Sequence, residues 1–346
     1  MESAYSLTAQ DWNNFLKNAG ESGSLLPYWL DGLFKKRSIW DQHLSPRTKK
    51  LLENAFDFTL PEISRTLESG DGTTKFQVRF ADGLEVETVL IPFHKRFTVC
   101  LSTQVGCGMK CSFCYTGTQG LKRNLETHEI VGQYLLVYNW LKQKDKHSLT
   151  PSIVFMGQGE PLHNDVNVKK AIDILNDRQI LGVGLRQMTL STVGYLPALS
   201  KLKDFSKINL ALSLHSPFEE QRSQLIPLNN KYPLSAVMAA LDEIPLLRNQ
   251  FITYEYLLIK DFNMSEEHSL ELSRLLSHRK ALINLIPFNP FPGSRWQRPS
   301  AEEIEIFKQS LVARKLRVMV RNTKGDDILA ACGQLKIKEL ARDYVR

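Results

Sequence analysis

Three of the five cysteines in this 346-residue chain stand close together, as Cys107, Cys111 and Cys114 in a CxxxCxxC pattern. Cysteine thiolates bind zinc and iron–sulfur clusters. A structural zinc site takes four protein ligands, and zinc ribbons pair two CxxC units, but the sequence has no second unit. Three thiolates on one loop suit a 4Fe-4S cluster in which three irons have cysteine ligands and the fourth iron stays open to another ligand. The pattern therefore favours a catalytic cluster, with three buried structural cysteines as the alternative.

Of the two remaining cysteines, Cys100 stands alone upstream of that loop and Cys332 lies near the C-terminus. The first residues, Met1 to Tyr5, lack the basic and apolar regions of a secretory signal, so we expect a cytoplasmic protein. An odd number of cysteines in a reducing compartment argues against a disulfide framework. Metal or redox chemistry is the better interpretation.

Composition indicates a globular protein with a nucleic-acid partner. Apolar residues make up 42% of the chain and charged residues 23%, and no apolar run is long enough to span a membrane. The formal net charge is +7, and the stretch from Lys308 to Arg346 is rich in Lys and Arg. A basic region of this kind favours RNA or DNA as a partner over a membrane. A solvated basic face is the alternative.

Short β-rich runs alternate with helix-period segments over most of the chain. We expect strands at residues 97–102, 152–156, 187–191, 208–214, 251–259, 282–287 and 316–321. Each connection is long enough for a crossover helix, so the strands should be parallel and buried on both faces. Six β/α units and a trailing strand are too few for a closed eight-stranded barrel, so the pattern predicts a partial (β/α)6 barrel.

The first part of the chain has a different pattern. Helices are expected near residues 9–17, 26–36 and 45–54, followed by a hairpin of residues 74–80 and 84–91 that turns at Asp82-Gly83. We therefore divide the chain into an N-terminal helical accessory domain (1–75), a β linker (76–96), the barrel with a C-terminal segment that carries Cys332 (97–335), and a basic tail (336–346).

Polar residues follow the ends of the expected strands, where parallel β/α barrels bind their ligands. Besides the cysteine loop after the first strand, these residues are Gly159 and Glu160 after the second, Ser191 at the third, Ser213, Leu214 and His215 at the fourth, and Asn289 after the sixth. Singly, such residues are more often caps, turns or core residues. Their gathering at one barrel face favours a ligand site.

The cysteine pattern, with Phe113 before its last cysteine, resembles the radical S-adenosylmethionine (SAM) enzymes, in which SAM chelates the open iron. Longer motifs resemble one family closely, the RlmN/Cfr radical SAM methyltransferases, which methylate an sp² carbon of adenine in RNA. The motifs are the segments 102–107, 119–125, 159–162, 213–215, 284–287, 289–290 and 325–335. The resemblance implies a radical SAM barrel in which Cys107, Cys111 and Cys114 hold a 4Fe-4S cluster.

The same resemblance implies how SAM is bound and used. Glycines such as Gly159 let the backbone approach SAM, Glu160 accepts from its ammonium, and Ser191, Ser213 and Asn289 bond its carboxylate or ribose. Leu214 and His215 belong to the same set. Two SAM molecules are consumed in each turnover.

In the implied reaction, the Cys332 thiolate first takes a methyl group from one SAM by displacement. A 5′-deoxyadenosyl radical from the second SAM then removes a hydrogen from this group, whose carbon adds to adenine. Cys100 resolves the enzyme–RNA link by forming a disulfide with Cys332, and Glu87 accepts a proton; a solvent-facing Glu87 is the alternative. All five cysteines then have a role.

The resemblance implies 23S rRNA and tRNA as substrates, an electron donor such as flavodoxin or ferredoxin, a monomer and no membrane. Glu160-Pro161 follows the RlmN form, which methylates C2, whereas Tyr115-Thr116-Gly117 leans towards the Cfr form, which methylates C8. Gln158 stands where both forms usually have Met, and His163 replaces an apolar residue. We favour C2. The rivals are a C8 methyltransferase, a radical SAM enzyme that uses SAM only as an oxidant, and a zinc-bearing RNA-binding module.

Overall fold

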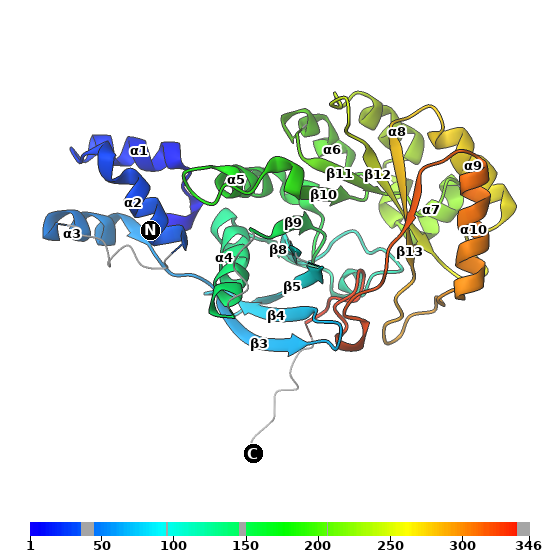
Figure 1. The fold of residues 1–346 in the computed structure, drawn as a ribbon, viewed down its shortest axis with the longest axis horizontal. Helices are drawn as coiled ribbons and strands as arrows, with labels where there is room; N and C mark the ends of the chain where they lie inside the picture. The colour runs from blue at the N-terminus through cyan, green and yellow to red at the C-terminus, as the bar shows by residue number, and fades with distance from the viewer. Residues whose placement is uncertain (36–44, 95, 145–149, 206, 338–346) are drawn as a thin grey trace, which may run out of the picture.

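The computed structural model describes residues 1–346 except 36–44, 95, 145–149, 206 and 338–346. Most of the expected basic tail, residues 338–346, therefore lies outside the described residues. The described part is elongated, with a small group of helices at one end and a larger α/β body at the other (Figure 1).

A sheet of ten strands forms the centre of the α/β body, in the order β14-β13-β12-β11-β10-β9-β6-β5-β4-β3. Its seven parallel strands are β6 (Arg96–Cys100), β9 (Ser152–Phe155), β10 (Met188–Thr192), β11 (Asn209–Ser213), β12 (Ile252–Leu258), β13 (Ala281–Pro287) and β14 (Val318–Val320). These are the seven strands expected from the sequence. Among the described residues, the two ends of the sheet do not pair, so the α/β unit is a partial barrel, as expected.

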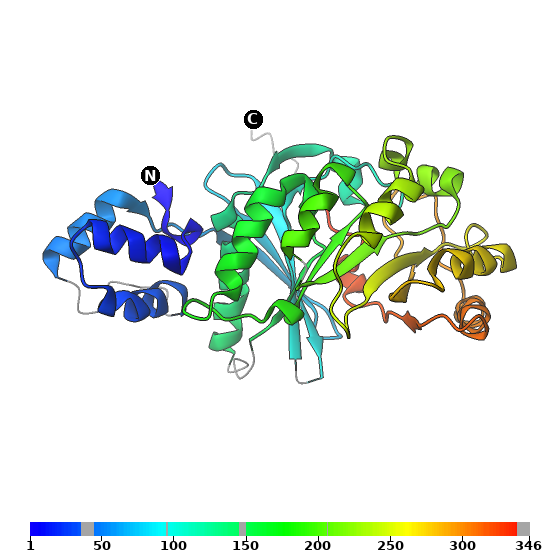
Figure 2. The ribbon, with the colours of Figure 1, turned by 90° about the horizontal axis from the view of Figure 1, so that it is seen from above.

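Helices connect the parallel strands and cover the outside of the sheet (Figure 2). They are α4 (Thr127–Gln143), α5 (Asp165–Asn176), α6 (Leu196–Leu199), α7 (Glu219–Leu225), α8 (Leu234–Asp242), α9 (Glu266–Leu276) and α10 (Ala301–Ala313). Ser265 and Ser300 begin α9 and α10 with reciprocal capping hydrogen bonds, which satisfy backbone groups that a helix start leaves free. The strands between these helices are buried on both faces, which explains their nearly continuous apolar sequences.

Three antiparallel strands extend the sheet at one end: β3 (Glu62–Glu68), β4 (Thr74–Arg79) and β5 (Glu85–Phe93). The hairpin of β4 and β5 was expected, and Gly83 supplies the positive φ of 78° that its turn requires. Strand β3 was not expected, because it lies within residues 1–75, for which the sequence predicted helices. Its sequence, EISRTLE, is mostly polar, and a mostly exposed edge strand buries too little to leave a strong apolar pattern.

The N-terminal helices are α1 (Ala9–Asn18), α2 (Leu26–Leu30) and α3 (Pro46–Ala55), which form the end of the molecule far from α10 (Figures 1 and 2). They confirm the three expected helices, although α2 continues as a π-helical turn, Asp31–Lys35. Trp12, Leu16 and Trp29 are buried between them in a core continuous with that of the barrel.

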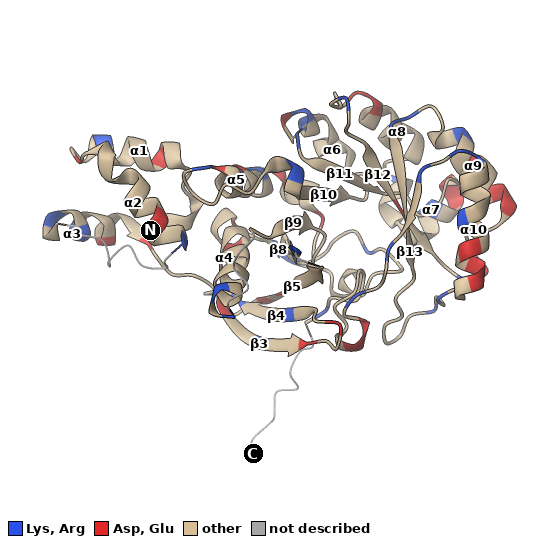
Figure 3. Ribbon diagram, in the orientation of Figure 1, with Lys and Arg blue, Asp and Glu red and all other residues tan. Residues whose placement is uncertain are grey.

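The last described segment crosses from β14 through the turn η9 (Asp326–Ile328) to the antiparallel strands, so that Cys332 comes to the barrel mouth. Acidic residues gather on α10 (Figure 3), and the stretch expected to carry the excess of basic charge, Lys308 to Arg346, begins in the last part of this helix. No helix among the described residues is long and apolar enough to cross a membrane.

Candidate active site

A small hairpin closes the base of the cysteine loop. Strand β7 (Gln104–Gly106) pairs with β8 (Leu121–Asn124), and the Cys107 amide donates to the carbonyl of Gly120 at 2.9 Å. Gly106 has a φ of +76°, and a Cβ there would lie 1.9 Å from the Gly120 carbonyl oxygen. Glycine is therefore required at this position, which fixes where the loop leaves the barrel.

The three loop cysteines line one pocket at the carboxyl ends of the strands, together with Glu160 and His215. This cluster pocket, as we call it, encloses about 860 Å³, part of it open to solvent. The ring of Phe113 packs edge-on against His215, with centroids 4.6 Å apart. The cysteine loop thus contacts the motif that ends the fourth parallel strand, as the sequence predicted for one shared site.

Most of the residues expected to bind SAM line this same pocket. They are Gly159, Glu160, Ser191, Ser213 and His215. Leu214 differs: its side chain is in the barrel core, its amide donates to Glu255 and its carbonyl accepts from Arg222. Asn289 lines a neighbouring pocket rather than this one.

Glu160 is a buried carboxyl group that faces the cluster pocket. Its Oε1 accepts from the Leu162 amide at 3.1 Å and its Oε2 from the Val193 amide at 2.9 Å. Burial raises its pKa to about 7, although these hydrogen bonds oppose the shift. A bound cation at this position would favour the ionised carboxylate. The adjacent Gly159, with a φ of +107°, has no room for a Cβ beside Gln104.

His215 is neutral at physiological pH in this structure. Burial, aided by the nearby Arg222 charge, lowers its pKa to about 3. Its Nδ1 accepts from the Leu257 amide at 3.0 Å, which fixes the ring and leaves the other face of the imidazole to the pocket and Phe113.

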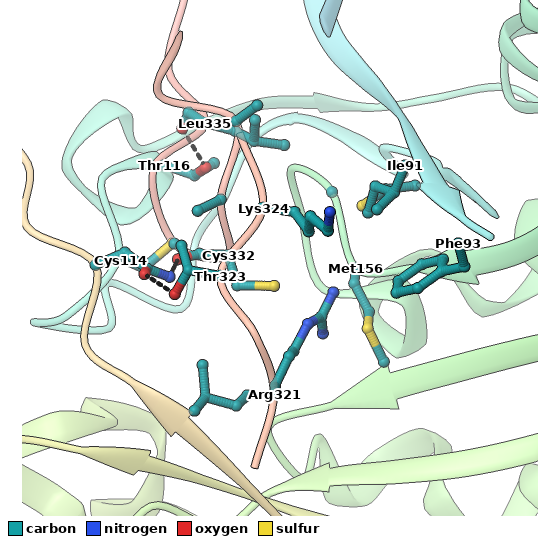
Figure 4. A pocket seen from close by; sticks show the side chains of 17 residues that line it. Ile91, Phe93, Cys114, Thr116, Met156, Arg321, Thr323, Lys324, Cys332 and Leu335 are labelled. Carbon is teal, nitrogen blue, oxygen red and sulfur yellow. Dashed lines mark hydrogen bonds between the residues drawn. The ribbon is translucent and has the colours of Figure 1, made fainter. Parts of the chain in front are cut away.

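A second pocket adjoins the first and contains both of the other cysteines, Cys100 and Cys332. We call it the relay pocket; it encloses about 710 Å³, including open space. In Figure 4, Cys332 and Cys114 lie on one side and Phe93 and Met156 on the other, with Arg321 between them. Cys332 also lines the cluster pocket, so it stands where the two pockets meet.

Hydrogen bonds tie the Cys332 segment to the cysteine loop and to the end of β13. The Tyr115 amide donates to the Gly333 carbonyl at 2.6 Å, and Thr116 Oγ1 donates to the Leu335 carbonyl at 2.6 Å. Asn289 Nδ2 donates to the carbonyl of Cys332 itself at 3.1 Å. The segment is therefore held at several backbone positions while its thiol faces open space.

Charge around the two relay thiols comes from residues that the sequence analysis did not select. Burial raises the pKa of Cys100 to about 12 and raises that of Cys332, and the nearby Arg321 guanidinium opposes both shifts. The pKa of Arg321 is itself raised, chiefly by Cys332 and also by Glu255. Arg321 ends the last expected strand, and Glu255 lies within an otherwise apolar strand. A charged residue in a strand that should be buried is unusual, and this feature of the sequence could have identified both residues.

Glu87 lines neither of the two pockets. Its side chain is buried, with Oε1 2.8 Å from the Lys75 ammonium and Oε2 accepting from the Lys336 amide at 2.7 Å. It is thus neither solvent-facing nor part of the lining of the relay pocket.

Comparison with known proteins shows the family. A model of the Radical SAM superfamily matches residues 101–273. The dual-specificity RNA methyltransferase RlmN of Bdellovibrio bacteriovorus is 36% identical over 334 residues, which cover 96% of this chain and 83% of that protein. The RlmN of Rhodospirillum rubrum is 43% identical over 301 residues, 86% of this chain and 70% of that protein. This chain belongs to the RlmN family.

The RlmN family assignment agrees with the fold. A radical SAM methyltransferase from Sphaerobacter thermophilus has a crystal structure that superposes with a TM-score of 0.89 at 35% identity, covering 97% of this chain and 99% of that one. The expected partial radical SAM barrel is confirmed, and the protein is a radical SAM RNA methyltransferase. Family membership removes the rivals of a zinc-bearing RNA-binding module and of an enzyme that uses SAM only as an oxidant.

The donor set of the cluster pocket fits the 4Fe-4S cluster of the radical SAM superfamily. Among the described residues, no three His, Cys, Asp or Glu side chains are close enough to hold a single metal ion. The three loop thiols instead line one open pocket. Each thiolate of such a cluster binds a different iron, so the three thiols must lie around a space that holds the whole cluster and need not converge on one ion.

Two departures from the RlmN motifs have polar partners in the structure. Gln158 accepts from the Glu87 amide at 3.0 Å and donates to Gln119 Oε1 at 3.0 Å. His163 Nδ1 lies 3.0 Å from Gln104 Nε2, and its ring packs against Tyr195. Both polar side chains are therefore accommodated without an unpaired polar group.

Proposed function

We propose that this RlmN-family enzyme methylates C2 of adenine in 23S rRNA, and the adenine 3′ of the anticodon in tRNA, through a methylated Cys332. The observation that carries the proposal is the position of Cys332, which lines both the cluster pocket and the relay pocket. A residue that accepts a group in one place and delivers it in another needs access to both.

Cys107, Cys111 and Cys114 would hold the cluster, and Glu160, Ser191, Ser213 and His215 would surround the SAM molecule bound to it. On receiving one electron from a reductant, a cluster with SAM bound would supply a 5′-deoxyadenosyl radical, which removes a hydrogen atom from the methyl group on sulfur. Radical chemistry suits the target, because C2 of adenine has no lone pair with which to attack a methyl sulfonium.

Cys332 has two parts in this reaction. As a thiolate it attacks the methyl carbon of one SAM, which forms a thioether and releases S-adenosylhomocysteine. Burial raises the pKa of this thiol, and the Arg321 guanidinium opposes that shift and so favours the reactive thiolate. After hydrogen removal, the carbon on its sulfur bonds to the adenine ring and joins enzyme to RNA.

Cys100 would release the product. Before this step the adenine adduct would give up one electron to the cluster and its ring proton to a base that we assign to Glu87. The Cys100 thiolate then attacks the Cys332 sulfur, so that a disulfide forms and the carbon–sulfur bond to the base breaks, and the released carbon takes a proton to complete the methyl group. The shared pocket of Cys100 and Cys332 supports the sulfur–sulfur step. Glu87, buried against Lys75, would need a change of partners to reach the base.

The relay pocket has features suited to an unstacked adenine. Phe93 is 47% exposed at its wall, and Arg321 and Lys324 bring positive charge to it. Enzymes that modify a base within RNA take it out of its stack, and aromatic rings receive such bases well. The relatives are named dual-specificity RNA methyltransferases, which supports two RNA substrates here.

The test is anaerobic incubation of the cluster-reconstituted protein with SAM, a reductant and unmodified 23S rRNA or tRNA. Digestion and nucleoside mass spectrometry then compare the product with 2-methyladenosine and 8-methyladenosine. We expect 2-methyladenosine. The 8-methyl isomer would replace this proposal with the Cfr-type reaction, and 5′-deoxyadenosine without either product would show another substrate.

A further inference from the structure

Lys75 is a buried lysine to which the proposed reaction gives no part. It lies on β4 with 7% of its surface exposed, and its ammonium is 2.8 Å from Oε1 of Glu87 on the neighbouring strand β5. Gln77 pairs with Glu87 in the sheet register, so Lys75 is the diagonal neighbour of Glu87 on the same face. Two charges are removed from water here, and such burial is costly unless each charge is fully partnered.

The other partners of this ion pair lie on the loop that carries Cys332. Lys75 Nζ donates to the carbonyl of Leu329 at 3.1 Å, and Glu87 Oε2 accepts from the amide of Lys336 at 2.7 Å. Leu329 and Lys336 lie on either side of Cys332 in the sequence. The cation thus holds the beginning of the loop and the anion holds its end.

The beginning of the loop needs such a contact. Leu329 has a φ of 53°, a left-handed conformation that is unfavourable for a residue with a branched side chain. A backbone conformation of this kind persists when surrounding contacts determine it, and the bond from Lys75 is one of those contacts.

We propose that Lys75 and Glu87 form a clamp that holds the loop 329–336 closed and so places the Cys332 thiol where the two pockets meet. Lys75 is then a positioning residue, and Glu87 has a positioning part besides the proton transfer assigned above. The functional consequence rests on the proposed role of Cys332, but the clamp itself is tested without RNA.

Several observations distinguish a clamp from an ion pair that only stabilises the sheet. Both Glu87 oxygens are occupied, one by the cation and one by the loop amide. The Lys336 side chain also reaches back over the cysteine loop, with Nζ 3.1 Å from Thr118 Oγ1 and over the ring of Tyr115. The end of the clamp thereby also contacts the segment that follows Cys114.

The experiment measures amide hydrogen exchange by mass spectrometry in the cluster-containing protein, comparing Lys75→Met with the wild type. Loss of a charge-assisted contact should speed exchange in peptides covering 329–336 by about 10- to 100-fold. Arg79→Gln is the matched control, because Arg79 lies on the same strand and pairs with Glu85 at 2.8 Å without touching the loop. It should leave exchange in 329–336 unchanged.

A double variant separates loop closure from overall stability. Lys75→Met leaves Glu87 buried without its cation, whereas Lys75→Met with Glu87→Met removes both charges and should recover resistance to urea. The clamp predicts that 329–336 still exchanges rapidly in the double variant. Wild-type exchange in either variant, or a return of slow exchange together with stability, would overturn the proposal.

An activity measurement completes the test. Lys75→Met should lower kcat for methylated adenosine while SAM binding by equilibrium dialysis stays within about twofold, because neither Lys75 nor Glu87 lines the cluster pocket and the side chains proposed to bind SAM do not lie on the loop 329–336. An unchanged kcat would overturn the functional part of the clamp. Failure of the wild type to make methyladenosine would instead count against the proposed function and leave the exchange result valid.

Discussion

Cys100 and Cys332 line one pocket, although one ends a central strand of the sheet and the other lies on the loop after its last strand. The barrel brings them together because β6 lies in the middle of the sheet while the C-terminal segment folds back across the barrel mouth. Asn289, at the end of β13, donates to the Cys332 carbonyl and fixes that crossing. A shared pocket is what the proposed exchange between their two sulfurs would require.

Single substitutions of the two cysteines should therefore fail in different ways. Cys332→Ala should abolish methylated product, because no sulfur remains to carry the methyl group. Cys100→Ala should allow the carbon–carbon bond to form but not its release, so a covalent protein–RNA species should accumulate. Denaturing gels with labelled RNA, together with nucleoside mass spectrometry, distinguish the two results.

Iron and sulfide content is the control for both variants, since neither residue is among the proposed cluster ligands and both variants should retain the cluster. Cys111→Ala, by contrast, should lose it. Normal turnover in Cys332→Ala or Cys100→Ala would exclude the relay.

Glu160 should contribute strongly to SAM binding. Its carboxyl group faces the cluster pocket, and burial disfavours its ionised form. The positively charged ammonium of SAM would stabilise that ionised form. Glu160→Gln keeps the shape and one acceptor oxygen but not the charge. We expect SAM affinity, measured by equilibrium dialysis under anaerobic conditions, to fall roughly 10- to 100-fold, as for loss of a hydrogen bond to a charged group.

Glu271→Gln on the outer helix α9 is the control for that measurement, because this glutamate pairs with Arg274 on its own helix and does not line the cluster pocket. Its SAM affinity should match that of the wild type. Equal affinities for Glu160→Gln and the wild type would place the SAM ammonium elsewhere.

The same carboxyl group should make the cluster-free protein less stable as pH rises. The folded-state pKa of Glu160 is about 7, raised from a usual value of 4.5, so between these values the folded state keeps a proton that the unfolded state releases. Stability therefore falls with increasing pH over this window, by about 2 to 3 kcal/mol between roughly pH 5 and pH 8.

Urea unfolding of the wild type and of Glu160→Gln at these two pH values measures this contribution. The variant has no group to titrate there, so its stability should change less with pH by that amount. A pH dependence equal to that of the wild type would show that Glu160 is not protonated in the folded protein at neutral pH.

Much of the site was predictable because the barrel rule converts sequence order into position. Residues such as Glu160, Ser191 and Ser213 follow strands whose apolar runs are clear, and parallel strands bring their carboxyl ends to one edge. That rule does not say which of two adjoining pockets a residue reaches. It could not place Asn289 in the relay pocket or Leu214 in the core.

What the sequence did not indicate depends on contacts between distant segments. Lys75 occurs in a hairpin that reads as an ordinary half-exposed strand, and only the return of the C-terminal loop brings a partner to it. The sequence also did not indicate the edge strand β3, because most of its residues are exposed and polar and so show no alternation of apolar and polar positions.

Phe93 offers the last prediction, on how the RNA base is held. Phe93 is 47% exposed and faces the relay pocket from the side opposite Cys332, at the end of β5, so packing does not explain its aromatic side chain. If an adenine stacks on it, Phe93→Ala should lower kcat/KM for RNA by roughly 5- to 100-fold, the usual effect of removing one base–aromatic stack. Phe93→Trp should retain most of the activity, because it keeps a ring.

Ile306→Ala, at an apolar residue 64% exposed on α10, is the control for loss of exposed apolar surface and should behave as the wild type. Anaerobic steady-state assays with varied RNA measure all three, and a Phe93→Ala enzyme with an unchanged kcat/KM would show that the base is held by other walls of the pocket.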